Sequence, residues 1–113
     1  MYLLNRSTLI VKLKKPYLDW INYVSAPEKF TLESLNIENN VFLIPEFDTK
    51  EQLESIIKSA YTEIFEVELQ AWYADESTWP EKRDYKTFKQ WFDITVHSML
   101  FDTSEEILER DDF

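Results

Sequence analysis

The sequence predicts a single α+β domain, in which a small, three-stranded sheet supports a long amphipathic helix and several shorter helices. Three observations indicate this fold: one long helical pattern, three short segments typical of strands, and short helical patterns between them. Of the 113 residues, 44% are hydrophobic and 16% are aromatic, which suffices for one core. We expect the globular domain to span residues 1–102 and an acidic, frayed tail to span residues 103–113.

The longest helical pattern runs from Asp48 to Tyr73. Its apolar residues recur at steps of three and four, which places them on one stripe, while Glu54 and Glu66 fall on the opposite side. Thr49 followed by Gln52 has the spacing of a capping box, in which two side chains satisfy backbone N–H groups at a helix start. We expect one continuous helix against which the other elements pack. The stripe contains Leu53, Ile56, Ile57, Ala60, Tyr61, Ile64, Phe65, Val67, Leu69, Ala71 and Trp72.

Four segments precede this helix. Alternating apolar residues over Ser7–Lys14 predict a strand with one buried face. Pro16 is suited to open a short helix over Pro16–Val24, and Thr31 is suited to cap another helical segment. Val41–Ile44 is apolar throughout, which predicts a strand covered on both faces.

The C-terminal part contains the third predicted strand. Asp84 has the position of an N-cap for a helix over Tyr85–Trp91, and the strand is expected to follow over Phe92–Phe101. The spacing of Ile107 and Leu108 is compatible with a turn of helix within Ser104–Arg110, but we expect this segment to fray. The pattern leaves the order of the strands open. The strand's two faces carry Phe92, Ile94 and Val96 on one side, and Asp93, Thr95 and His97 on the other.

Composition excludes several classes of site. There is no cysteine, which removes disulfides, thiol nucleophiles and cysteine-ligated metals. There is no glycine, which argues against phosphate-binding loops and dinucleotide-binding fingerprints. With one histidine, a zinc site would need an unusual set of carboxylates, so we expect no metal and no cofactor. No apolar run has the length of a membrane span, and the N-terminus lacks the pattern of a signal peptide, which favours a cytoplasmic protein.

The net charge of −10 is concentrated in the middle of the chain. Residues 31–76 contain eleven acidic and two basic residues, a net charge of −9. Such a surface repels phosphate backbones, so we expect no nucleic-acid partner. A basic protein is the partner that this charge favours.

An enzymatic function would have to involve His97, the only histidine. Thr95 lies about 6.6 Å away on the same strand face, and Asp93 lies about 13 Å away. A hydroxyl beside an imidazole is a candidate nucleophile and base. This suggests a small ligand-binding or hydrolase-like domain as one alternative. The other is a half-buried strand histidine, hydrogen-bonded to a neighbour.

Our preferred interpretation is a non-enzymatic protein-binding or regulatory module, with an immunity-type inhibitor of a basic toxin or a DNA mimic as its extreme form. Its surface would combine the acidic side of the long helix with aromatic residues near the helix end. For Trp79 the alternative is that its ring plugs the following loop onto the domain. A monomer or a homodimer formed through a sheet edge are both compatible with the pattern. The candidate binding residues are Glu63, Glu66, Trp72, Asp75, Glu76 and Trp79.

Three stretches also carry a resemblance: Asn5–Ser7, Asp75–Pro80 and Trp91–Asp102. Together they resemble a family of small, acidic, uncharacterised bacterial proteins of about this length, and the likeness extends over nearly the whole chain. The resemblance implies a bacterial, cytoplasmic, single-domain protein. It implies no activity, cofactor or binding residue.

Overall fold

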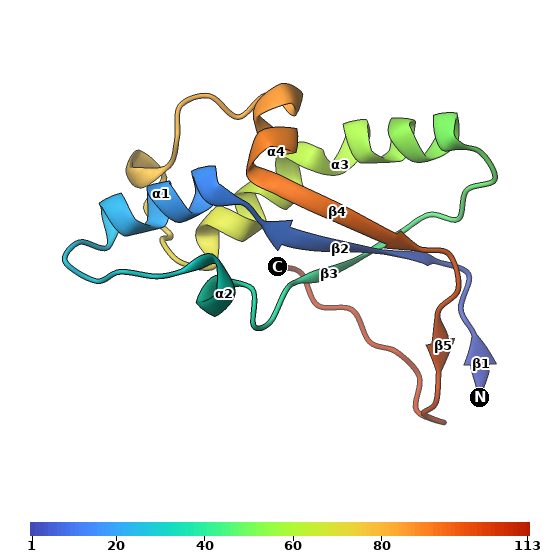
Figure 1. Ribbon diagram of the computed structural model, residues 1–113. Coiled ribbons are helices and arrows are strands. Elements are labelled where there is room, and N and C mark those ends of the chain that lie inside the picture. Colours follow the sequence, from blue (N-terminus) through green and yellow to red (C-terminus); the bar gives the residue numbers. More distant parts are fainter.

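The computed structural model describes all 113 residues and has an α+β fold, as predicted (Figure 1). Its main sheet is antiparallel and has the order β3-β2-β4. β2 (Ser7–Leu13) is the central strand, flanked by β3 (Val41–Ile44) and β4 (Phe92–His97). Helices cover one face of this sheet, and the other face is open, because the side chains of Lys12 and Asp93 on it are exposed.

The long helix α3 (Lys50–Gln70) is unbroken, as predicted, but it is shorter than the expected Asp48–Tyr73. Its start has the predicted capping box. Thr49 Oγ1 accepts a hydrogen bond from the Gln52 N–H at 3.1 Å, and Gln52 Oε1 accepts one from the Thr49 N–H at 3.3 Å. The cap therefore fixes the start of the helix one residue after Thr49.

The shorter helices also follow their predicted starts. α1 (Lys15–Val24) has Pro16 in its first turn. α2 (Leu32–Leu35) is capped by Thr31, and α4 (Tyr85–Trp91) is capped by Asp84, whose carboxylate accepts from the Thr87 N–H at 2.8 Å. A short 3₁₀ helix, η1 (Glu76–Thr78), lies in the loop between α3 and α4.

The expectation that Val41–Ile44 is covered on both faces was wrong. β3 is an edge strand, paired with β2 alone in a register that places Phe42 opposite Leu9. Ile44 is 3% exposed, whereas Val41 is 57% and Leu43 is 52% exposed. Exposure alternates along this apolar run because helices cover only the face of the sheet to which Ile44 points.

The predicted strand Phe92–Phe101 is also divided. β4 ends at His97, and β5 (Phe101–Asp102) pairs with β1 (Tyr2–Leu3) in a separate two-stranded sheet that the sequence did not predict. In Figure 1 the two-stranded sheet of β1 and β5 projects from the body of the domain. Ser104–Arg110 forms no helix, and residues 103–113 are all exposed.

The core combines aliphatic side chains with a cluster of aromatic rings that α1, α3, α4 and β4 contribute. Phe65 of α3 lies at its centre with no exposed surface. The ring centroid of Phe65 is 5.1 Å from that of Phe92 and 5.4 Å from that of Trp91. Tyr17 and Trp20 of α1 extend the cluster, with an edge-to-face contact at 5.2 Å. Such ring pairs add to the stability that burial alone provides.

The turns contain no residue with a positive φ angle. They depend instead on side chains that bond to the backbone. Asn36 is an example, since its side-chain amide accepts from the Leu13 N–H at 2.9 Å and donates to the Leu13 carbonyl at 3.0 Å. The connections are therefore held by polar side chains in ordinary right-handed and extended backbone conformations.

Candidate functional site

The three candidate catalytic residues lie on the open face of the sheet. Asp93, Thr95 and His97 are all exposed on β4. The His97 imidazole forms no ion pair and no hydrogen bond, so the expectation of a half-buried, bonded histidine was wrong. Asp93 instead approaches Lys14, with 3.8 Å between carboxylate and ammonium. The strand therefore places the three residues on one face without joining them into a hydrogen-bonded group.

Acids and histidine form no cluster of three or more side chains that could hold a metal ion. The most unusual acid is Glu68 of α3, which is only 4% exposed. Its Oε1 accepts from the Asn40 side-chain amide at 3.0 Å. Burial raises the pKa of Glu68, and the bond from Asn40 lowers it in part. Glu68 was not among the candidates predicted from the sequence, although its place three residues after Phe65 and four after Ile64 puts it on the buried stripe.

The two candidate tryptophans differ in exposure. Trp79 is 8% exposed, its indole N–H donates to the Tyr73 carbonyl at 2.8 Å, and the Arg83 guanidinium lies over its ring at 5.6 Å. Its ring therefore packs the loop between α3 and α4 against the domain, which was the alternative to stacking on a ligand. Trp72 is 43% exposed and packs edge-on against Phe30, with 5.0 Å between ring centroids. Trp72 is thus the tryptophan whose ring is available at the surface.

Asp75 and Glu76 belong to the turn that starts η1. The Asp75 carboxylate accepts from the Ser77 hydroxyl at 2.7 Å and from the Ser77 N–H at 3.0 Å, and these bonds lower its pKa. Glu76 is exposed. Asp75 therefore has a local structural role, since its side chain caps the short helix.

Glu63 and Glu66 lie on α3 and form no ion pair with the chain's own basic residues. Glu54, nearer the start of the same helix, differs. Its carboxylate lies 4.0 Å from the Lys58 ammonium and accepts from the Tyr85 hydroxyl at 3.0 Å. The charges of Glu63 and Glu66 thus remain uncompensated.

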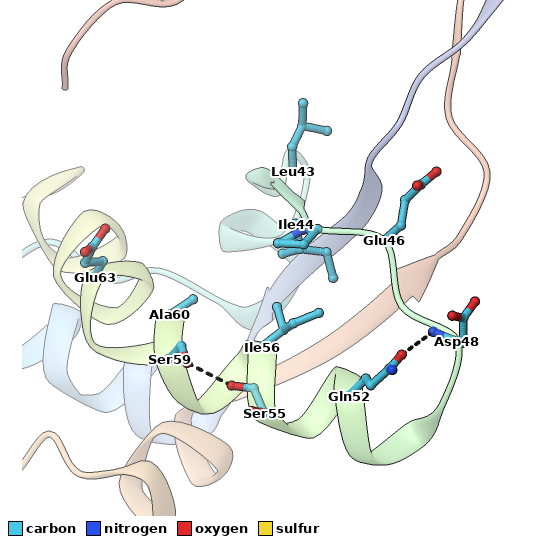
Figure 2. A pocket seen from close by; sticks show the side chains of 11 residues that line it. Leu43, Ile44, Glu46, Asp48, Gln52, Ser55, Ile56, Ser59, Ala60 and Glu63 are labelled. Atoms are coloured by element: carbon cyan, nitrogen blue, oxygen red, sulfur yellow. Dashed lines mark hydrogen bonds between the residues drawn. The ribbon is translucent and has the colours of Figure 1, made fainter.

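A groove lies between α3 and the end of β3 (Figure 2). One wall is a row of α3 side chains at helical spacing, which includes Ile56, Ala60 and Glu63. The other wall is Leu43 and Ile44 of β3, with the loop that follows them. The hollow has a volume of about 680 Å³.

The loop after β3 closes one end of the groove. Its backbone is tied to α3 because the Asp48 N–H donates to Gln52 Oε1 at 2.6 Å (Figure 2). Glu46 and Asp48 lie at this end and Glu63 lies toward the other end. The lining includes these three acids and no basic residue, so the groove has a negative potential. Glu63 was a candidate from the sequence but the groove was not, because the groove exists only where β3 is an edge strand.

A second, more apolar hollow continues the groove under β3. It has a volume of about 390 Å³ and shares Leu43, Ile44, Ala60 and Glu63 with the first. Its other lining residues are Phe42, Ile64, Val67 and the terminal Phe113. The combined groove is therefore acidic at the loop end and apolar at the Phe42 end.

Comparisons with known proteins provide no further information on the site. No family model, no curated protein and no solved structure matches this chain. None of the helices combines the length and apolar composition that crossing a membrane requires. The functional argument depends on the geometry and charge described above.

Proposed function

We propose that this protein is a non-enzymatic binding module and that its partner is a basic protein. The observation that carries the proposal is the groove between α3 and β3, which has three acids and no basic residue in its lining. Glu63 lies in this groove, and Glu66 follows one turn later on α3. Neither carboxylate has an ion-pair partner within the chain, so both are free to pair with Lys or Arg of another protein.

Two further features support a protein partner. Trp72, at the end of α3, offers an exposed aromatic ring of the kind that is enriched in protein interfaces. The net charge of −10 would accelerate the encounter with a basic partner and disfavour nucleic acid. Salt should weaken such binding, because exposed charges are screened.

The hydrolase-like alternative has less support. It requires Asp93, Thr95 and His97 to act together, and no hydrogen bond joins any two of these side chains. The large groove involves none of the three residues. A binding function is therefore the better account of the geometry.

The proposal is tested with the immobilised full-length chain and its Glu63→Lys/Glu66→Lys variant, each incubated with the same cell lysate. We expect the wild type to retain basic proteins that elute at raised salt concentration. The double variant should lose at least about tenfold in affinity for those proteins, which corresponds to about 1.4 kcal/mol. Quantitative mass spectrometry of the eluates measures the difference.

The matched control is Glu106→Lys/Glu109→Lys, which makes the same change in net charge on the exposed tail. This variant should retain the same proteins as the wild type, apart from a small general effect of charge. Equal losses in both variants, or retention that salt does not weaken, would contradict a specific acidic site on α3.

A further inference from the structure

The outer edge of β3 has unpaired backbone groups. The Val11 N–H donates to the Asn40 carbonyl at 3.2 Å, and the same register places Phe42 opposite Leu9. In an antiparallel pair, successive residues direct their backbone groups alternately toward and away from the partner strand. Asn40 and Phe42 therefore face β2, whereas the N–H and C=O groups of Val41 and Leu43 point away from the sheet. β3 has no second neighbour, so these four groups are free.

The groove lies along this free edge. Leu43 and Ile44 point to opposite faces of the sheet, because successive side chains in a strand alternate. Both residues line the hollow together with α3, which places it alongside the free edge of β3, between β3 and α3. Unpaired main-chain groups and a side-chain groove thus occur at one place.

The two ends of the groove differ in character. Glu46 and Asp48 lie at the loop end, and Glu63 lies between the two hollows. At the other end Phe42 and Val67 line an apolar hollow. An occupant of complementary chemistry has a basic residue at one end and a bulky apolar residue at the other.

We propose that an extended, basic segment of the partner adds to the β3 edge as a fourth strand of the main sheet. Its main chain bonds to Val41 and Leu43, an apolar side chain enters the hollow near Val67, and Lys or Arg pairs with the acids at the loop end. This inference rests on the proposed function, since it specifies how the basic partner binds. Strand addition of this kind derives affinity from main-chain bonds and specificity from alternate side chains.

Charge argues against occupants from the same protein. A second copy pairing through β3 would bring together two chains that each carry a net charge of −10 and the same acidic groove. The chain's own tail is also acidic. Its terminal Phe113 reaches the apolar hollow but is 91% exposed. A basic segment has the opposite charge and is favoured at this edge.

The test uses peptides of nine residues, selected from a random display library against the immobilised full-length chain. Selected peptides should carry Lys or Arg and a bulky apolar residue, and their affinity should fall on Glu63→Lys. Val41→Pro removes an edge N–H that the fold does not use, and a proline is tolerated at such an edge position. This variant should bind the peptides about tenfold more weakly. The control Val41→Thr keeps the N–H and should bind like the wild type.

A second measurement leaves the protein unchanged. Single N-methyl groups are introduced along the best peptide, one amide at a time, and affinity is measured by titration calorimetry. Strand addition predicts losses at every second amide, because alternate N–H groups face β3. Bound peptide should also slow hydrogen exchange of the Val41 and Leu43 amides.

The outcomes separate the two proposals. Peptides that depend on Glu63 and salt, but tolerate N-methylation at all positions, would overturn strand addition and leave the proposed function intact. A library that yields no basic peptide would contradict both. A dimer that light scattering detects and Val41→Pro abolishes would assign the edge to a second copy, and so would overturn the inference.

Discussion

The two halves of α3 differ in how they are covered. In the C-terminal half, Ile64, Phe65, Glu68 and Leu69 are buried against the sheet and neighbouring helices, whereas in the N-terminal half only Ile57 is buried. In Figure 1 the N-terminal half extends beyond α4. One continuous helix therefore has two roles: its C-terminal half (the core half) contributes most of its buried residues, and its N-terminal half (the groove half) supplies most of the helical wall of the acidic groove.

Polar interactions help to hold the N-terminal half of α3, which has fewer buried residues. The capping box of Thr49 and Gln52 satisfies the backbone at its start. Further along, Glu54 accepts from the Tyr85 hydroxyl of α4. Burial, together with this bond and the Glu54 charge, raises the pKa of Tyr85 to about 12. Polar contacts at the surface thus add to the packing of Leu53 and Ile57, and the side toward β3 remains open as the groove.

The largest expected effect comes from truncating a ring in the core half. Phe65→Ala should lower the free energy of unfolding by about 3–5 kcal/mol, because Phe65 is fully buried among aromatic rings. Ile56→Ala, in the groove half, should cost about 1 kcal/mol, since Ile56 is only partly buried. Urea denaturation followed by tryptophan fluorescence measures both. Equal losses would mean that the two halves contribute alike to the core.

A smaller, pH-dependent effect should follow from Glu68→Gln. Burial raises the pKa of Glu68 in the folded state, so folding takes up a proton between the unfolded and folded pKa values. The stability that Glu68 contributes is complete below the unfolded pKa and is lost as pH rises through the folded pKa. Glutamine stays neutral and keeps an acceptor for Asn40. The variant should therefore be more stable than the wild type near neutral pH, on the order of 1 kcal/mol.

This gain should disappear at about pH 4, where glutamate is itself largely protonated. Thermal unfolding at a series of pH values measures the difference between the two proteins. Glu63→Gln is the control, because Glu63 is exposed, and its effect should be small at every pH. A gain for Glu68→Gln that does not change with pH would show that charge burial is not its cause.

A third effect, similar in size but local, should come from the start of the groove half. Thr49→Ala removes one acceptor of the capping box and should cost about 1 kcal/mol. It should also increase hydrogen exchange at the Gln52 amide while leaving the amides around Phe65 unchanged. Thr31→Ala, which removes the corresponding cap of the short α2, is the comparison. Exchange that rises equally throughout α3 would argue against separate halves.

The elements of this fold were largely predictable because their signals are local. A cap depends on residues three positions apart, as in Thr49 with Gln52 and Asp84 with Thr87, and such pairs are visible in the sequence. Strand pairing is not local. Nothing within Val41–Ile44 indicates that it pairs on one side only, or that the two-residue β1 and β5 meet at all.

The same distinction applies to the candidate site. Glu63 and Glu66 were identifiable from charge and helical spacing alone. The groove beside Glu63 was not, because it requires the edge position of β3 and the Asp48–Gln52 bond. Trp79 illustrates the converse: its type was compatible with a ligand contact or with packing of the loop onto the domain, and its burial and its bond to a carbonyl decide for packing.

The turns of this chain have no positive φ angle and no glycine, which has a practical consequence for mutagenesis. Every position already has a backbone conformation that alanine adopts without steric cost. Outside the prolines, an alanine scan of the whole chain would therefore record the loss of side-chain interactions with little change in backbone strain. In most proteins glycine positions interrupt such a scan, whereas in this protein the scan would extend through the loops.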